Sequence, residues 1–354
     1  MVPGLTSDDV KQRAGDLGFD LCGVAPAAGF PELGALRDWL DRGYAGEMEY
    51  LTRTADRRSD VRAVLPSARS VIVLGTVYNV DRPYSTEIAD PAIARISRYG
   101  WGDDYHAVIE RRLEGLLDWM REVSAEPFEA RRYVDTGPVQ ERVYAQQAGL
   151  GWIGKNTCLI NPRLGSWLFL AEIICSLRLE PDAPGLDLCG TCTLCLDACP
   201  TGALVPPRTL DATRCLSYLT IELKSGVPEA MREALGAHVY GCDICQEVCP
   251  WNGAPARSED PSWLPRPELD RPALPELWKR SDADLRRILK GSAMKRAGIE
   301  RLRRNVAVAL GNAGDPACEA ALVADLPDGE TATGPLVTDH VEWARSRTTT
   351  RRPG

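Results

Sequence analysis

Two runs of closely spaced cysteines constrain this chain more than any other feature of its sequence. The first run has three cysteines at intervals of three residues and a fourth followed by proline, and it consists of Cys189, Cys192, Cys195, Cys199 and Pro200. This C-x2-C-x2-C-x3-C-P spacing is the bacterial arrangement of thiolates around [4Fe–4S] clusters. The run therefore predicts iron–sulfur clusters, which support one-electron chemistry at low potential.

The second run is one cysteine short. Val239 occupies the position of the missing thiol, and the run consists of Cys242, Cys245, Cys249 and Pro250. In two-cluster proteins the last cysteine of each run ligates the other cluster. The first cluster is therefore expected to use Cys189, Cys192, Cys195 and Cys249. The second is expected to use Cys199, Cys242, Cys245 and Cys215, the only other cysteine between the runs.

Zinc and disulfides are the alternative explanations for so many cysteines, and the spacing disfavours both. Structural zinc uses four ligands in two pairs and has no need of the longer run. Disulfide frameworks are typical of short secreted chains, whereas this chain has 354 residues and no recognisable signal peptide. The remaining cysteines stand in apolar surroundings and are expected to be small core residues: Cys22, Cys158, Cys175 and Cys318.

The chain is several times longer than two clusters need, so two or three domains are expected. Its longest apolar stretch, residues 167–174, is interrupted by Glu172 and is too short to cross a bilayer. Oxygen-sensitive clusters without an export signal predict a cytoplasmic location. The expected division is an α/β domain at 1–180, a two-cluster ferredoxin-like domain at 181–260 and a linker with a helical tail at 261–354.

Residues 1–180 have the pattern of a mixed α/β domain, so the expected class is a multidomain α+β or α/β protein. Ser7 can cap a short helix that runs to Leu17. Strands are predicted at 19–24, 70–77 and 167–174, and the second of these is apolar enough to be buried on both faces. A helix is predicted from apolar residues at helical spacing: Val108, Leu113, Leu116, Leu117 and Met120.

The C-terminal part begins with a proline-rich connector at 255–275 and continues as helices. Residues 304–312 and 339–344 have the pattern of the paired helices of a HEAT-type repeat. The net charge is −8, but between residues 276 and 305 ten Lys or Arg stand against four Asp or Glu. This basic stretch is either a solvated helix face or a contact surface for a nucleic acid.

Several motifs in order along the chain carry a family resemblance. They are ISRYGWGDDYH at 96–106, YVDTGP at 133–138, GWIGKNT at 151–157, GSW at 165–167 and CLSYLTIE at 215–222, together with both cysteine runs. In these motifs the chain resembles epoxyqueuosine reductase, a cobalamin- and iron–sulfur-dependent enzyme that completes queuosine in tRNA. The resemblance covers nearly the whole length, and the unusual fourth ligand at Cys215 fits it.

The resemblance implies reduction of an epoxide to an alkene, with two electrons, two protons and loss of the oxygen as water. It makes Asp135 the acid that protonates the departing oxygen, and a carboxyl can do so at neutral pH only if burial keeps it protonated. Judged on local sequence alone, Asp135 would instead begin a turn before a helix entered at Pro138. Asp104 and His106 are equally explained as a helix cap and a surface histidine.

The resemblance also implies a base-off corrin site, without a histidine ligand to cobalt. By motif position the residues that line or contact the corrin are Arg58, Ser97, Asp135, Leu159, Leu170 and Ser217. A tRNA partner would be held by phosphate contacts from the basic stretch. The candidate contacts are Lys290, Lys295, Arg296, Arg301, Arg303 and Arg304. A small electron-donor protein or reductant and a monomeric state complete the expectation.

Two other functions stay open at this point. A cobalamin-dependent reductive dehalogenase would share the corrin and the two clusters, although such enzymes usually carry an export signal and lack a C-terminal repeat. A non-catalytic iron–sulfur electron carrier would need neither the α/β half nor Asp135. Corrin absorption beside the cluster band in the spectrum of the anaerobic protein would separate the two enzymes from the carrier.

Overall fold

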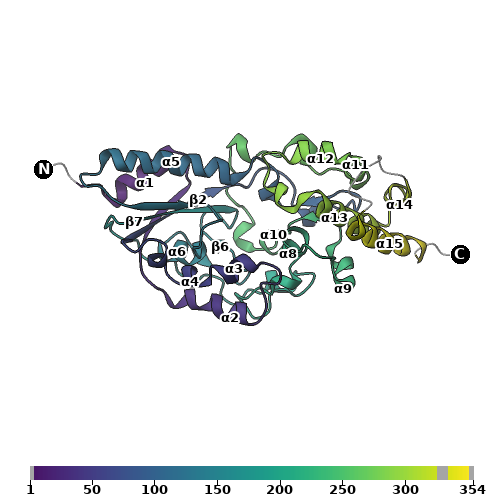
Figure 1. Cartoon of the computed structure of the whole chain (residues 1–354), viewed down its shortest axis with the longest axis horizontal. Helices are drawn as coiled ribbons and strands as arrows, with labels where there is room; N and C mark the ends of the chain where they lie inside the picture. The colour runs from purple at the N-terminus through teal and green to yellow at the C-terminus, as the bar shows by residue number, and fades with distance from the viewer. Residues whose placement is uncertain (1–3, 325–333, 351–354) are drawn as a thin grey trace.

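The computed structural model describes residues 4–324 and 334–350. A four-stranded sheet with helices on both faces occupies one end of the molecule, and the C-terminal helices occupy the other (Figure 1). The predicted C-terminal segment 261–354 includes residues 325–333 and 351–354, which lie outside the described residues. Among the described helices, none combines the length and apolar composition that crossing a bilayer requires.

The sheet is antiparallel throughout, with the strand order β1-β2-β7-β4. The bounds are β1 Leu21–Pro26, β2 Ser70–Val77, β7 Leu168–Cys175 and β4 Ala130–Tyr133. Every residue of β2 is buried, as its apolar sequence predicts for a strand covered on both faces. The predicted strand at 70–77 is confirmed, and those at 167–174 and 19–24 are shifted by one and two residues.

Helices cover both faces of the sheet. One face packs against α1 Ser7–Asp16 and α5 Tyr105–Val123, and all five apolar residues that predicted α5 are buried. The other face packs against α6 Glu141–Gln147. Three short helices lie beyond it and are α2 Ala35–Asp41, α3 Glu49–Arg53 and α4 Ala55–Arg58.

The N-cap of α1 differs from the prediction. Thr6, not Ser7, accepts the backbone N–H of Asp9, and Asp9 in return accepts the backbone N–H of Thr6. The Ser7 hydroxyl instead donates to the carbonyl of Glu180. A hydroxyl one residue earlier in the chain is therefore in reach of the third N–H of the helix, as a capping box requires.

The segment with the cysteine runs has little regular structure. Its short helices are α7 Leu194–Asp197, α8 Leu216–Ile221, α9 Glu229–Arg232 and α10 Ile244–Glu247. The strand β8 His238–Tyr240 pairs in parallel with β3 Arg95–Ile96, and β5 Trp152–Ile153 pairs with β6 Leu159–Ile160. The β3–β8 pairing attaches the cysteine segment to the sheet domain, whereas β5 and β6 both precede the first cysteine run.

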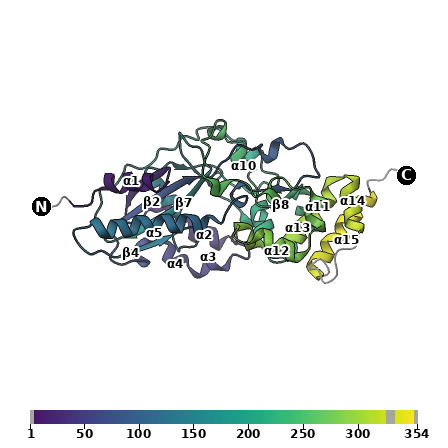
Figure 2. The ribbon, with the colours of Figure 1, turned by 90° about the horizontal axis from the view of Figure 1, so that it is seen from above.

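The described residues of the C-terminal part include five α-helices, which Figure 2 shows at the end opposite the sheet. They are α11 Leu274–Lys279, α12 Asp282–Leu289, α13 Gly298–Ala313, α14 Pro316–Val323 and α15 Pro335–Thr350. Helices α13 and α15 approach closely at Gly311, where a Cβ atom would lie 2.7 Å from the Cα of Ala344. Paired helices are thus present, while their assignment to a HEAT repeat stays a prediction.

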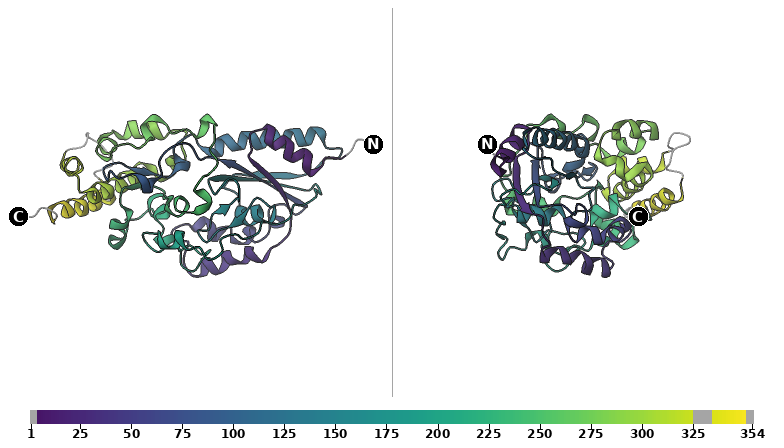
Figure 3. Two further views of the ribbon diagram at one scale, coloured as in Figure 1. Left: turned by 180° about the vertical axis from the view of Figure 1, so that it is seen from behind. Right: turned by 60° about the vertical axis from the view of Figure 1, so that its left-hand side comes forward.

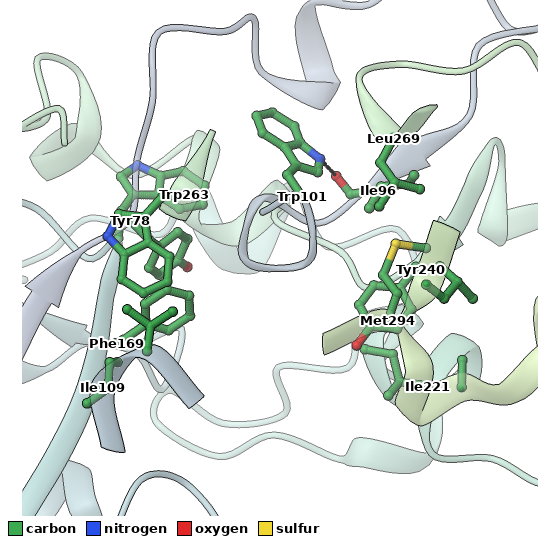
Figure 4. Close-up of a cluster of buried hydrophobic side chains, with 14 of the residues drawn as sticks. Tyr78, Ile96, Trp101, Ile109, Phe169, Ile221, Tyr240, Trp263, Leu269 and Met294 are labelled. Atoms are coloured by element: carbon green, nitrogen blue, oxygen red, sulfur yellow. Dashed lines mark hydrogen bonds between the residues drawn. The ribbon is translucent and has the colours of Figure 1, made fainter. Parts of the chain in front are cut away.

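The three predicted segments share one hydrophobic core. The proline-rich connector runs along residues 92–103, where Ala94 donates to the carbonyl of Pro272 and Leu274 to that of Ala92. Figure 3 shows from behind how the C-terminal helices continue from the sheet domain. The close-up in Figure 4 labels buried residues from all three segments: Tyr78, Ile96, Trp101, Ile109, Phe169, Ile221, Tyr240, Trp263, Leu269 and Met294.

Two of the six basic residues predicted to contact tRNA are buried, which corrects the prediction. Arg303 and Arg304 are 1% and 0% exposed. Arg303 donates to the carbonyls of Trp278 and Arg280 at the end of α11, and it pairs with Asp282. Arg304 donates to three carbonyls in and after α8, those of Leu219, Leu223 and Ser225. Both guanidinium groups thus satisfy carbonyls that the ends of helices leave without partners.

Replacing Arg304 by Met should destabilise the protein, because it leaves three buried carbonyls without donors. A buried group left unpaired costs about 1–3 kcal/mol, so a loss of roughly 3 kcal/mol or more is expected. Thermal unfolding of the anaerobic protein would measure it. The exposed Lys290 is the control, and Lys290→Met should leave the unfolding temperature near that of the wild type. An unchanged unfolding temperature in Arg304→Met would contradict the capping role.

Candidate functional site

The four cysteines expected to hold the first cluster line one pocket. Cys189, Cys192 and Cys195 come from the start of the first run, and Cys249 arrives from the end of the second. The Trp152 indole N–H donates to Cys189 Sγ at 3.4 Å. Burial raises the pKa of Cys195 to about 11, and the other three thiols add to the rise. Thiols crowded in this way fit a cationic metal centre, which binds them as thiolates.

The four cysteines expected for the second cluster also gather. Cys199 follows α7, Cys215 caps α8, Cys242 follows β8 and Cys245 lies in α10. Burial raises the pKa of Cys215, and the charge of Cys199 raises it further. Burial likewise raises the pKa of Cys242, with Cys215 adding to it. Within the described residues no group of Cys, His, Asp or Glu is arranged for a single metal ion. Four thiols, one of them from outside both runs, thus form the set that the cysteine spacing predicts for the second cluster.

Cys158 does not lie where the sequence analysis placed it. It was expected in an apolar core, but its thiol is hydrogen-bonded to Cys245, and this bond lowers the pKa of Cys158 and raises that of Cys245. Cys175 and Cys318 are buried, as expected, and Cys22 is half-buried. The sequence held one sign that Cys158 lies near the functional site, because this residue directly follows the motif at 151–157.

Asp135 lies two residues after the end of β4 and has the left-handed φ of +58°. The Tyr105 hydroxyl donates to Asp135 Oδ2 at 3.0 Å, and His106 Nε2 lies 3.4 Å from the same oxygen. Tyr105 and His106 begin α5, and Asp104 is the N-cap of this helix. The Asp135 side chain is 53% exposed, so a substrate can reach the carboxyl group that these neighbours orient.

Charge on His106 decides the protonation of Asp135. Partial burial raises the pKa of Asp135, but the hydrogen bond and positive charge of His106, with the Tyr105 hydroxyl, lower it below its usual value. Burial lowers the pKa of His106, but Asp135 and Asp104 raise it above its usual value. The expectation that burial keeps Asp135 protonated is therefore not met. The two opposite shifts favour a proton on His106, which lies between two carboxylates, over one on Asp135.

Asp104 is a helix cap, as the sequence suggested, whereas His106 is half-buried and not a plain surface histidine. Asp104 accepts the backbone N–H of His106 as a cap and lies 2.7 Å from His106 Nδ1. Lys295 Nζ lies 2.7 Å from the second oxygen of Asp104. His106 is thus a half-buried partner of the Asp135 carboxylate as well as a residue of the first helical turn.

The residues expected around the corrin have different surroundings. Leu159 is buried, and Leu170 packs half-buried against the same hydrophobic cluster. Arg58 donates to the carbonyl of Val139, and its charge acts on Glu172. Ser217 lies half-buried in α8. Ser97 differs from these residues, because its buried hydroxyl donates to Asp243 between Cys242 and Cys245.

The other four basic residues predicted to contact tRNA are at least partly exposed. Lys295 is 63% exposed and pairs with Asp104. Arg296 is 44% exposed, pairs with Glu222 at 2.6 Å and stacks over the Tyr50 ring. Arg301 is half-buried and donates to backbone carbonyls at 297 and 221, whereas Lys290 is exposed. Positive charge therefore borders the site through Lys295 and Arg296.

The fold and the site define a mixed α/β oxidoreductase with a double iron–sulfur segment. A family model described as "4Fe-4S double cluster binding domain" matches residues 188–252. Another, described as "Epoxyqueuosine reductase QueG, DUF1730", matches residues 58–136. The chain is 40% identical over 339 residues to an epoxyqueuosine reductase of Xanthomonas campestris, with 95% of this chain and 94% of that one covered. This chain belongs to the epoxyqueuosine reductase family.

Other relatives agree with this assignment. An epoxyqueuosine reductase of Escherichia coli is 37% identical, with 97% of this chain and 89% of that one covered. A crystal structure of epoxyqueuosine reductase with a tRNA-Tyr epoxyqueuosine-modified tRNA stem loop has a TM-score of 0.83 and 31% identity, covering 96% of this chain and 89% of that chain. The enzyme from Streptococcus thermophilus has a TM-score of 0.84 and 28% identity, covering 98% and 90%.

His106 should stabilise the fold in a pH-dependent way. Its folded pKa is raised, so its contribution is fully present below the unfolded value of 6.5 and is lost as pH rises through the folded pKa. The loss of unfolding free energy in His106→Gln should therefore be largest below pH 6.5 and shrink at higher pH. Denaturant unfolding at a series of pH values would measure this loss.

His340 provides the opposite case for the same measurement. Burial lowers its pKa to about 4, so its contribution is present above pH 6.5 and is lost as pH falls. The cost of His340→Gln should shrink toward low pH. A cost of His106→Gln that does not change between pH 5.5 and 9 would contradict the charged pairing with Asp135.

Proposed function

We propose that this chain reduces epoxyqueuosine in tRNA to queuosine, with cobalamin as cofactor and two [4Fe–4S] clusters as the electron path. One observation carries the proposal. In a chain of this family, the half-exposed Asp135 carboxylate is held by Tyr105 and His106, and positive charge from Lys295 and Arg296 borders its opening. The reaction removes the epoxide oxygen as water and leaves an alkene, so two electrons and two protons enter.

The cysteine sets supply the electron path. The first set is Cys189, Cys192, Cys195 and Cys249, and the second is Cys199, Cys215, Cys242 and Cys245. Each set suits one four-iron cluster that carries one electron at a time. The exposed residues next to the first set, Leu186 and Leu194, leave it open to a small electron-donor protein. A monomer in the cytoplasm would suffice, because the chain itself carries both sets and Asp135.

The residues present fit a base-off corrin. His238 and His340 lie in the core with their Nδ1 atoms bonded to backbone carbonyls, and His106 lies between two carboxylates, so each imidazole has another role. Leu159 and Leu170 would provide an apolar wall, and Arg58 and Ser217 polar contacts. Ser97 would support the site only indirectly, because its hydroxyl donates to Asp243 and its N–H to the carbonyl of Tyr240. When bound, cobalamin supplies the reduced metal centre that opens the carbon–oxygen bond.

Protons reach the departing oxygen from the chain's own side chains. Asp135 is the residue exposed to the substrate, and it passes on a proton that His106 holds. Asp104 and Lys295 orient the His106 ring from its other side. Such a pair can act as an acid at neutral pH even though the carboxyl group itself is ionised before the substrate arrives.

The two alternative functions are less well supported. Family membership favours the tRNA substrate over an organohalide. A plain electron carrier would leave Asp135, Tyr105 and His106 without a task. The solved structure with a modified tRNA stem loop is a precedent for the substrate, and another, from Bacillus subtilis, has its catalytic aspartate loop swung out of the active site.

Replacing Asp135 by Asn should abolish most turnover while leaving the fold and clusters intact. The amide keeps the shape but cannot pass on a carboxyl proton, and loss of a general acid typically costs about 10²–10⁴ in rate. The assay is conversion of epoxyqueuosine-bearing tRNA by the reconstituted anaerobic enzyme, read by nucleoside mass spectrometry. Asp103→Asn, at an exposed aspartate paired with Arg266, is the matched control and should retain activity. Normal turnover in Asp135→Asn would contradict the acid role and would mean that Asp135 only forms the turn.

Cys215→Ala should remove the second cluster and spare the first. Iron analysis is expected to fall from about eight to about four irons per chain, because each cluster holds four. EPR of the reduced protein should then report one cluster. Cys318→Ala removes a buried cysteine from α14 and should keep both clusters. Two intact clusters in Cys215→Ala would show that another residue, with Cys158 the nearest candidate, supplies the ligand.

tRNA binding should depend on the exposed basic residues and not on the buried arginines. Changing Lys290, Lys295 and Arg296 together to Gln removes up to three phosphate contacts, so binding should weaken and the dependence of log K on log salt should flatten by about 2. The control is the same charge change on the sheet domain, at the exposed Arg111, Arg121 and Arg131. Equal effects of both triple variants would move the tRNA surface away from the basic entrance.

A further inference from the structure

Glu172 is a buried acid that the proposed chemistry leaves unused. It lies in the middle of β7, where it is paired with Val73 of β2 and Tyr133 of β4. The residue is 0% exposed, and neither carboxyl oxygen accepts a hydrogen bond from any donor of the described residues. A carboxylate without water or donors would be strongly destabilised, so Glu172 is held in its protonated form.

Glu141 is the group that shares the proton of Glu172. Burial raises the pKa of Glu141, the charge of Asp135 raises it further, and a hydrogen bond from Glu172 lowers it. Burial also raises the pKa of Glu172, to which Glu141 adds. One proton shared by the two carboxyl groups accounts for both shifts. Glu172 keeps the proton and donates it in a hydrogen bond, and Glu141 keeps oxygen lone pairs free to accept.

The free oxygen of Glu141 is bonded to the backbone of the catalytic loop. Asp135 N–H donates to Glu141 Oε1 at 2.7 Å. This bond lies in the tight turn at Val134–Thr136, in which Asp135 has a φ of +58°. A non-glycine residue keeps such a φ only when its surroundings hold it there. In this turn the side chain of Asp135 is directed to Tyr105 and His106.

We propose that Glu141 and Glu172 are positioning residues, a carboxyl pair that shares one proton and holds the backbone of Asp135 in the conformation that presents its carboxyl group to the substrate. The inference rests on the proposed function of Asp135 and extends it to two residues outside the reacting atoms. Glu172 comes from the centre of the sheet, so the pair connects the most rigid element of the fold to a loop that carries the chemistry.

The pair is also sensitive to pH. The charged and titratable groups that face it are Asp135 on the loop, Arg142 next to Glu141 on α6, Tyr105 on α5, on which Glu141 acts, and Arg58, whose charge acts on Glu172. Loss of the shared proton at high pH would place two negative charges in contact beside Asp135. The two carboxylates would then repel each other, and the anchor of the loop would weaken.

Two variants of Glu141 separate anchoring from packing. Glu141→Gln keeps an oxygen for Asp135 N–H, whereas Glu141→Ala removes it. Turnover should fall about 10–100-fold in Glu141→Ala, as it does when supporting partners of a site are lost. Glu141→Gln should stay near the wild type, and the Michaelis constant for tRNA should be unchanged in both. At high pH the wild type and Glu141→Gln should both lose rate as His106 gives up its proton. The wild type should show a further decline from loss of the shared proton, and this further decline should be absent in Glu141→Gln, which has a single carboxyl group left to ionise.

Two further measurements make the test independent of a general loss of stability. In the Asp135→Asn background, Glu141→Ala should reduce the residual rate no further, because both changes affect one group. Amide hydrogen exchange in the holoenzyme should be faster at residues 134–136 in Glu141→Ala than in Glu141→Gln. The proposal would be overturned if the losses of rate from Asp135→Asn and Glu141→Ala multiplied in the double variant. Equal amide exchange at residues 134–136 in the two Glu141 variants would also overturn it. An inactive wild type would count against the proposed function instead, and the exchange data would still test the anchor.

Discussion

The antiparallel pairing of β2 with β7 is the constraint on which the rest of the structure depends. It extends over eight residues in each strand, from Ser70 opposite Cys175 to Val77 opposite Leu168. Both strands are largely buried, so their backbone groups must be satisfied by each other and by the outer strands. The β7–β4 pairing places Glu172 opposite Tyr133, two residues before Asp135, so the sheet core is joined directly to the loop that holds Asp135.

The chemistry of the site depends on where a few protons are held. His106 lowers the pKa of Asp135 and so favours its ionised form, whereas burial raises the pKa of Glu172, which accepts no hydrogen bond from the described residues. Glu172 is the more deeply buried of the two acids, whereas Asp135, the proposed catalytic acid, is 53% exposed. The division of roles follows from solvent access and hydrogen bonding, since all three residues titrate in ordinary ranges when exposed.

Positive charge in the C-terminal part serves two different purposes. Arg303 and Arg304 occupy the buried face of α13 and satisfy carbonyls at the ends of α11 and α8. Lys295 and Arg296 precede this helix and are exposed beside the acids Asp104 and Glu222. The helical period separates neighbours in the sequence into a structural set and a set open to phosphates.

The sequence alone determined the cysteine sets, the buried strand at 70–77 and, through the resemblance, Asp135, because spacing and apolar pattern are local properties of a chain. Tertiary structure decided what depends on contacts between distant segments. It placed Cys158 beside Cys245, buried Arg304, and turned Glu172 from an interruption of an apolar strand into a partner of Glu141. Burial and protonation of a side chain are set by neighbours that fold against it, and no one-dimensional pattern records them.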